Sequence, residues 1–157
     1  MALDLDGPAW DGEQMKITSM LRVGDELWLY YAANRGYMSA SKAHTGLATL
    51  RLDGFASINA GAEEGRLLTR PLGFIGLHLH VNAVVAPDGE LRVGFVKRDG
   101  TSVEGFSPDD CRPIKGDGVA MPVRWQDGRD IRALAHADVR LDFRLRNAKL
   151  YSFRVSD

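Results

Sequence analysis

The segment Thr45-Gly-Leu-Ala-Thr-Leu-Arg-Leu-Asp-Gly-Phe-Ala-Ser-Ile-Asn-Ala60 decides the fold. Its residues predict one β-strand, a turn at Asp53-Gly54 and a second short strand. An Asp-Gly pair favours a tight turn because glycine accepts positive φ and aspartate can hydrogen-bond to its own downstream backbone. Seven such pairs occur in the chain, and they begin at Asp6, Asp11, Asp53, Asp88, Asp99, Asp117 and Asp127. Short strands separated by these turns predict an all-β protein.

The C-terminal residues show the clearest alternation of apolar and polar side chains. Every odd position of residues 139–146 is apolar, and the pattern resumes at residues 151–155 after a turn at 147–149. This pattern predicts an antiparallel hairpin with one face in the core and one in water. The side chains expected in the core are Leu141, Phe143, Leu145, Tyr151, Phe153 and Val155. Those expected to stay accessible are Asp142, Arg144 and Arg146.

Two further elements are expected before this hairpin. Residues 77–86 and 91–97 are predicted to pair across Pro87-Asp88-Gly89. Residues 130–137 hold the one helical candidate, of one or two turns, in which Asp130 could act as the cap. Together these elements predict an antiparallel, jelly-roll-like β-sandwich over residues 44–157.

The N-terminal part differs from the rest. Residues 15–23 and 26–33 flank Gly24-Asp25, which suits a two-residue type II′ hairpin. The expected cross-strand pairs are Leu21 with Trp28, Met20 with Leu29, Ser19 with Tyr30 and Thr18 with Tyr31. Both faces of this hairpin then carry large apolar groups, so both should be covered. Residues 1–43 are therefore assigned to a hairpin and a connector that precede the sandwich.

Composition excludes several classes of protein. Of the 157 residues, 45% are apolar and 26% are charged, and the net charge is −1, which gives no electrostatic footprint for nucleic acid or an anionic membrane. Cys111 is the only cysteine, so no intrachain disulfide is expected. The N-terminal residues lack the basic and then apolar layout of a signal peptide, and we expect a cytoplasmic or redox-indifferent location.

Several stretches carry a resemblance to a known family. Besides residues 45–60 they are Gly105-Phe106-Ser107, Asp110-Cys111, Pro113-Ile114, Gly116-Asp117, Val123-Arg124-Trp125 and residues 147–153. In order and spacing they resemble the end of the last blade and the C-terminal β-sandwich of five-bladed β-propeller glycosidases. These enzymes belong to the group of glycoside hydrolase families 32 and 43. The resemblance implies that residues 1–43 contain the remnant of a blade hairpin.

The resemblance also bears on catalysis. It implies that catalytic carboxylates come from early propeller blades, and none of those motifs can be placed on these 157 residues. Glycoside hydrolysis needs two carboxyl groups about 5 to 9.5 Å apart. The acidic residues of this chain are expected to be solvated surface charges, and no catalytic residue is assigned. We expect the chain alone to be inactive.

Two clusters suggest metal binding. Asp109, Asp110 and Asp117, with the carbonyls of Ser107 and Gly116, could form a structural calcium loop, because Ca²⁺ prefers clustered oxygen ligands. His78 and His80 project from the same face of a predicted strand, but no third ligand is evident, so sheet packing is the better interpretation. No other cofactor is expected. A small buried role is expected for Cys111.

Exposed aromatic side chains could stack on the apolar face of a sugar ring. The candidates are Trp28, Tyr30, Tyr37 and Trp125, although a core position is the simpler interpretation for Trp125.

The sequence thus predicts a non-catalytic accessory domain of a glycoside-hydrolase-like protein. Its expected partners are a carbohydrate, and either a second copy of the chain through the N-terminal hairpin or a propeller domain. Two alternatives stay open: a glycoside hydrolase whose site is completed by a partner or a further segment, and a stand-alone lectin-like module.

Overall fold

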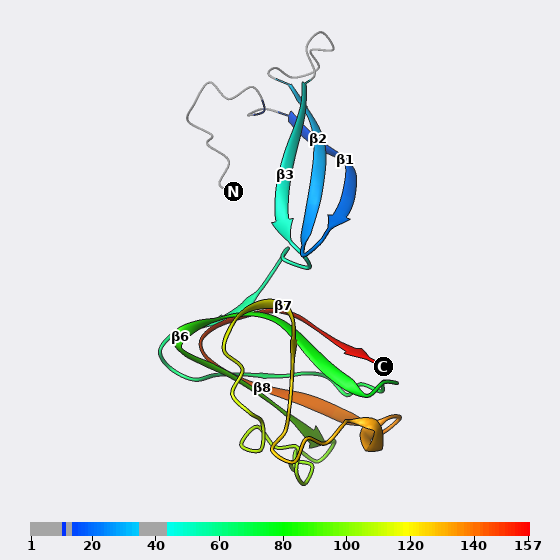
Figure 1. The fold of residues 1–157 in the computed structure, drawn as a ribbon, viewed down its shortest axis with the longest axis vertical. Coiled ribbons are helices and arrows are strands. Elements are labelled where there is room, and N and C mark those ends of the chain that lie inside the picture. Colours follow the sequence, from blue (N-terminus) through cyan, green and yellow to red (C-terminus); the bar gives the residue numbers. More distant parts are fainter. Residues whose placement is uncertain (1–10, 12–13, 35–43) are drawn as a thin grey trace. The chain divides into compact units, whose positions relative to one another are not determined.

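The computed structural model describes residues 11, 14–34 and 44–157 and contains two compact units, Met1–Phe55 and Ala56–Asp157 (Figure 1). The predicted boundary after residue 43 thus differs from the observed one. Strand β3 (His44–Arg51) belongs to the first unit because it pairs with β2 (Glu26–Asn34) along its whole length. The predicted connector at residues 35–43 lies outside the described residues.

The first unit is a three-stranded antiparallel sheet with the order β1-β2-β3. Strand β1 (Gln14–Val23) and β2 form the expected hairpin around Gly24-Asp25. Gly24 has a φ of +61° whereas Asp25 is not at positive φ, as a type II′ turn requires. The predicted register is confirmed as far as Ser19. Thr18 does not face Tyr31, because a bulge places Ile17 opposite that residue.

The second unit is one antiparallel sheet with the order β4-β8-β6-β7, in which β5 also pairs with β8. Its strands are β4 (Ile58–Ala60), β5 (Gly65–Leu68), β6 (His78–Lys97), β7 (Gly116–Pro122) and β8 (Val139–Ser156). The predicted helical segment is a single 3₁₀ turn, Arg132–Leu134, and the Asp130 carboxylate accepts a hydrogen bond from the Arg132 amide at 3.0 Å.

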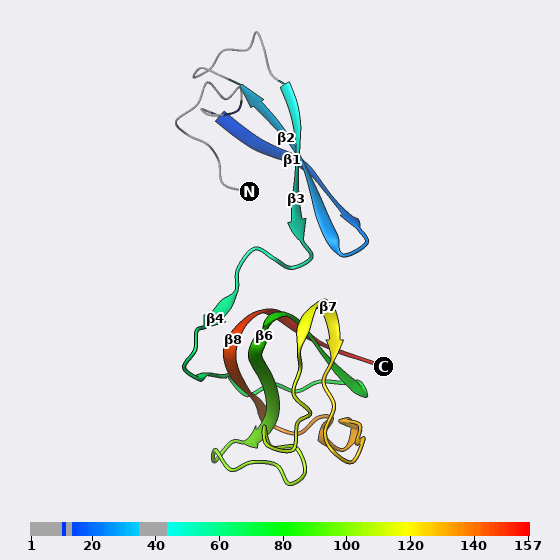
Figure 2. The same ribbon diagram turned by 60° about the vertical axis from the view of Figure 1, so that its left-hand side comes forward.

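Both hairpins predicted in this unit are wrong. Strands β6 and β8 are continuous, and they run side by side as two long, bent strands (Figures 1 and 2). Residues 86–89 form a bulge opposite Asn147, since Val85 pairs with Ala148 and Glu90 with Arg146. Asn147 adopts positive φ, and a Cβ on Gly89 would clash with its carbonyl oxygen. The turn-forming residues therefore bend two strands instead of reversing them.

The bulges also change which residues of β8 enter the core. Leu141, Phe143 and Leu145 are buried as predicted, but beyond the bulge the buried positions become Ala148 and Leu150. A second bulge follows, where Asn82 of β6 pairs with Ser152 and Ala83 pairs with Leu150. No residue of β6 therefore pairs with Tyr151. The expected burial of Tyr151, Phe153 and Val155 is therefore wrong: Tyr151 and Val155 are half-buried and Phe153 is 38% exposed.

Asp142 is a second departure from the prediction, because it is only 2% exposed. Its carboxylate accepts two hydrogen bonds from the Arg66 guanidinium, at 2.8 and 3.2 Å, and lies 3.4 Å from Arg144. Arg144 also pairs with Glu64 at 3.0 Å. A buried carboxylate requires such partners to offset its lost hydration. Arg144 is half-buried and Arg146 exposed, so Arg146 alone matches the expected accessibility fully.

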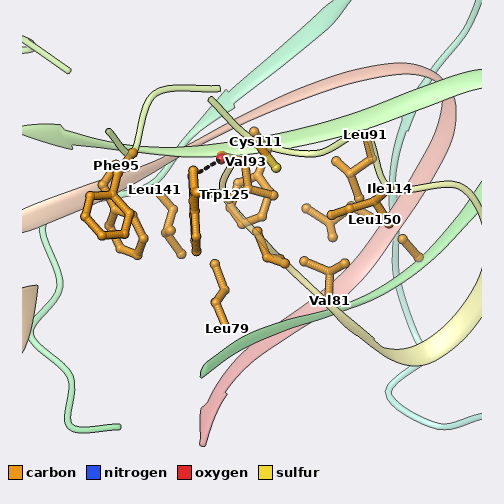
Figure 3. Close-up of a cluster of buried hydrophobic side chains, with 14 of the residues drawn as sticks. Leu79, Val81, Leu91, Val93, Phe95, Cys111, Ile114, Trp125, Leu141 and Leu150 are labelled. Carbon is orange, nitrogen blue, oxygen red and sulfur yellow. Dashed lines mark hydrogen bonds between the residues drawn. The ribbon is translucent and has the colours of Figure 1, made fainter. Parts of the chain in front are cut away.

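The bend in β6 and β8 closes the core of the second unit. Leu79, Val81 and Val85 precede the bulge and Leu91 and Val93 follow it, yet all five belong to one buried cluster (Figure 3). Two halves of one sheet thus face each other across the core, which is a sandwich-like arrangement. The all-β, antiparallel class is confirmed. The jelly-roll-like order is not confirmed, since the described strands of this unit form a single hydrogen-bonded sheet.

No helix in the described part of the chain has the length and apolar character to cross a membrane.

Candidate functional site

The three-stranded sheet of the first unit carries apolar side chains on both faces. We call the faces after two residues of β2, because alternate residues of a strand point to opposite sides. The apolar residues of the Tyr31 face are Met15, Ile17, Met20, Leu27, Leu29, Tyr31, Ala33, Ala48 and Leu50, and Arg22 and His44 lie on the same face. The apolar residues of the Trp28 face are Leu21, Val23, Trp28, Tyr30, Ala32 and Leu47, beside the polar residues Gln14, Lys16, Ser19, Glu26, Asn34, Thr45, Thr49 and Arg51. Both faces thus combine large apolar side chains with polar ones, and the Trp28 face is the more polar of the two.

Large side chains on each face are exposed. Ile17 and Met20 on the Tyr31 face are each 54% exposed, and Leu21 on the Trp28 face is 51% exposed. Contiguous apolar surface of this kind marks interaction sites in soluble proteins. β1 and β3 are moreover the edges of the sheet among the described residues, and sheet edges are templates for further strand pairing.

Local packing shows why the sheet holds its shape despite this exposure. The Tyr31 ring lies over Gly46, where any Cβ would clash with it. An aromatic ring over a glycine of the neighbouring strand shields backbone that would otherwise be uncovered. The Tyr31 hydroxyl donates a 2.8 Å hydrogen bond to the Asp11 carboxylate. That hydrogen bond, followed by burial, raises the pKa of Tyr31.

The predicted sugar-stacking residues are only partly brought together. Trp28 and Tyr30 are half-buried neighbours on the Trp28 face, and the Trp28 indole Nε1 donates to the Glu26 carboxylate at 3.1 Å. Tyr37 lies outside the described residues. Trp125 belongs to the second unit, so it does not share this face.

Trp125 is a core residue and not a rim residue. It is 1% exposed, and its Nε1 donates a 3.1 Å hydrogen bond to the Val93 carbonyl (Figure 3). Its ring lies 5.2 Å from that of Phe106 and 5.6 Å from that of Phe95, between ring centroids. The predicted sugar-stacking role of Trp125 does not fit this position, because a buried ring offers no face to a ligand.

The predicted calcium ligands do not converge in the described structure. Asp110 caps the turn at Ser107, whose amide and hydroxyl donate to its carboxylate at 3.0 and 2.7 Å. The serine hydroxyl and then the amide lower the pKa of Asp110. Asp109 is exposed on the same turn and Asp117 is exposed on β7. The described residues include no group of three His, Cys, Asp or Glu side chains that could hold a metal ion.

Cys111 is buried beneath the loop that carries these acids. It is 1% exposed, and its thiol donates to the Arg112 carbonyl at 3.3 Å. Burial is the main cause that raises the pKa of this thiol, and a raised pKa lowers the thiolate fraction. The position agrees with the expected small buried role.

We predict that Cys111 of the native protein reacts slowly with iodoacetamide. The reaction should be at least about tenfold slower than in urea, because burial both blocks access and suppresses the thiolate. Mass spectrometry of timed aliquots measures the two rates. Equal rates in native and unfolded protein would contradict the buried position.

Comparison with known protein families, curated proteins and solved structures finds no match for this chain. The resemblance to propeller glycosidases thus rests on the sequence stretches quoted above.

Proposed function

We propose that the chain acts as a non-catalytic accessory module of a glycoside-hydrolase-like protein. In this proposal the second unit is the accessory sandwich, and the first unit is a blade-like sheet that docks against other β-sheets. The observation that carries the proposal is the exposure of large apolar side chains on both faces of the β1-β2-β3 sheet. The second unit, in contrast, has a closed core of its own.

The physics of small sheets supports docking. An isolated two-stranded hairpin is at best marginally stable in water, and a small sheet gains stability as its apolar faces are buried. On the Tyr31 face Leu27, Tyr31 and Ala33 are already buried, but large apolar side chains stay exposed on both faces, so further cover is favourable on each. Stacked β-sheets cover each other at about 10 Å, and a propeller blade is covered in this way by its neighbours. Either a propeller or a second copy of the chain can supply this cover.

The described carboxyl groups support a non-catalytic role. A glycosidase needs a general acid whose pKa is raised. The pKa values of Glu90, Asp99 and Asp110 are instead lowered, chiefly by side-chain hydrogen bonds from Arg92, Thr101 and Ser107 respectively. Glu64 and Asp142 are paired with arginines.

We therefore predict that the purified chain does not hydrolyse aryl glycosides above the uncatalysed rate. The measurement is release of the aryl group from a panel of pyranosides and furanosides. Glu64→Gln and Glu90→Gln should leave the background unchanged, as should the control Glu104→Gln at an exposed loop position. Clear turnover that one of the first two substitutions abolishes and the control preserves would overturn the non-catalytic assignment.

A further inference from the structure

The second unit contains a cleft that the docking proposal does not use. It has a volume of about 410 Å³ and lies between the start of β6, the segment after β7 and the turn that follows Trp125. Two backbone hydrogen bonds brace its walls, from the Val123 amide to the Leu79 carbonyl at 2.9 Å and from the Ile131 amide to the Leu77 carbonyl at 3.1 Å. The cleft therefore belongs to the folded framework of the unit.

The cleft is lined by two arginines, one aspartate and two histidines. Its lining includes His78, His80, Arg124, Arg129 and Asp130. Arg129 is paired with Asp127 at 3.0 Å, and the Asp130 carboxylate is engaged by the Arg132 amide. The guanidinium of Arg124 has no acidic partner among the residues that the structure describes.

A second cation approaches from β8. Arg154 faces His80 in the register of β6 and β8, and its charge lowers the pKa of that histidine. Arg154 also has no acidic partner within the described ranges. Arg124 lines the cleft and Arg154 lies opposite His80 beside it, so these two charges exceed the one of Asp130 and favour a bound anion.

His80 supplies a neutral donor at the same place. Its Nδ1 atom is buried and has no hydrogen-bond partner in the described part of the chain. A proton on this buried nitrogen would lack an acceptor, so the neutral ring carries its proton on Nε2. Burial is the main cause of the lowered pKa of His80, followed by the charges of Arg154 and His78. The His78 ring lies edge-on at 6.5 Å between centroids.

The lining of the cleft also includes two apolar residues with accessible surface, Leu77, which is half-buried, and Pro122, which is exposed. An apolar surface beside a few polar groups is typical of small-molecule sites, and the C–H face of a sugar ring suits such a surface. A volume of about 410 Å³ is sufficient for a monosaccharide.

We propose that this cleft binds a small organic anion, a ring of monosaccharide size that carries a carboxylate or a phosphate. Arg124 binds the anionic group, Arg154 adds a positive charge beside His80, His80 donates a hydrogen bond from Nε2, and the ring packs on Leu77 and Pro122. The proposal is independent of sheet docking, because every residue it uses lies in the second unit.

The test is an NMR titration of the full chain, with backbone amides and histidine ring protons observed. The probes are glucuronate, glucose 6-phosphate, neutral glucose and inorganic phosphate. We expect saturable shifts at residues 77–80 and 122–125 with glucuronate or glucose 6-phosphate, at a Kd on the order of millimolar. Glucose should bind at least about tenfold more weakly, because it lacks the charge-assisted hydrogen bonds. The anionic ligand should also raise the pKa of His80.

Two variants and a control make the test specific. Arg124→Gln should weaken binding of the anionic sugar by about tenfold, the loss typical of one charge-assisted hydrogen bond. Arg154→Gln removes a neighbouring charge and not a ligand contact, so it should weaken binding by less, about threefold. Arg70→Gln, at an exposed arginine that does not line the cleft, should leave the affinity unchanged.

The proposal is overturned if neither anionic sugar gives saturable shifts at the cleft, or if glucose binds equally well. Binding of inorganic phosphate with an affinity equal to that of the sugar phosphate would refute the role of the ring. Equal losses in all three variants would show that the effect is one of overall charge and not of the cleft.

Discussion

Replacing Phe143 by alanine is expected to destabilise the second unit by about 3 to 5 kcal/mol, the usual cost of emptying an aromatic core site. Phe143 is fully buried in β8 and lies opposite Val93 of β6 and Leu67 of β5. Its ring is 5.6 Å from that of Phe153, between centroids. Removal of the ring therefore leaves a cavity between three strands that cannot close without moving them.

Urea denaturation monitored by near-ultraviolet circular dichroism measures this loss. The control is Ile75→Ala, which truncates a large apolar side chain of the second unit that is 74% exposed. The control should change the free energy of unfolding by no more than about 0.5 kcal/mol. A larger effect at Ile75 than at Phe143 would mean that the register of β8 is wrong.

The N-terminal hairpin could be predicted because its determinants are local. A two-residue turn with glycine at positive φ fixes the register of both flanking strands. The bulge near Thr18 could not be predicted, since nothing in residues 15–23 distinguishes a regular strand from a bulged one. The sequence also predicts strand β3 of this sheet. It does not predict that β3 pairs with β2, because this pairing joins distant parts of the chain.

In the second unit, residue types typical of turns lead to the wrong prediction of two hairpins. Asp88-Gly89 and Asn147 have the residue types of turns, and the same conformational freedom permits a bulge in a long strand. Which outcome occurs depends on burial: bending keeps Val85, Leu91 and Leu145 in one core. The alternation of apolar and polar residues does not predict which side chains of β8 are buried after residue 147, because each bulge moves the buried positions by one residue.

The candidate sites are harder to predict from the sequence than the strands, because their residues come together only in the tertiary structure. Trp125 precedes a turn, which suggested a rim position, but Phe95 and Phe106 enclose its ring. His78 and His80 were recognised as neighbours on one strand face. Their neighbours Arg124 and Arg154 cannot be identified from the sequence, because they come from distant parts of the chain. The fold places Arg124 in the lining of the cleft and Arg154 opposite His80.

A large effect is also expected in the first unit, because its sheet is proposed to be a docking element. An isolated sample of the chain has no propeller to cover the sheet, so a second copy is the available cover. Symmetric pairing of identical surfaces is the commonest route to a dimer. We predict that the chain associates in solution and that Ile17→Lys weakens this association at least about tenfold, because a charge in an apolar interface costs more than 1.4 kcal/mol.

Sedimentation velocity of the full chain over a range of concentrations tests this claim most directly. The control is Ile75→Lys, which makes the same change at an isoleucine of the second unit that is 74% exposed. We expect concentration-dependent dimers or larger species for the parent chain and for the control, and a shift to monomer for Ile17→Lys. A parent chain that sediments as a monomer at every concentration, or an Ile17→Lys variant that associates as the parent does, would contradict it.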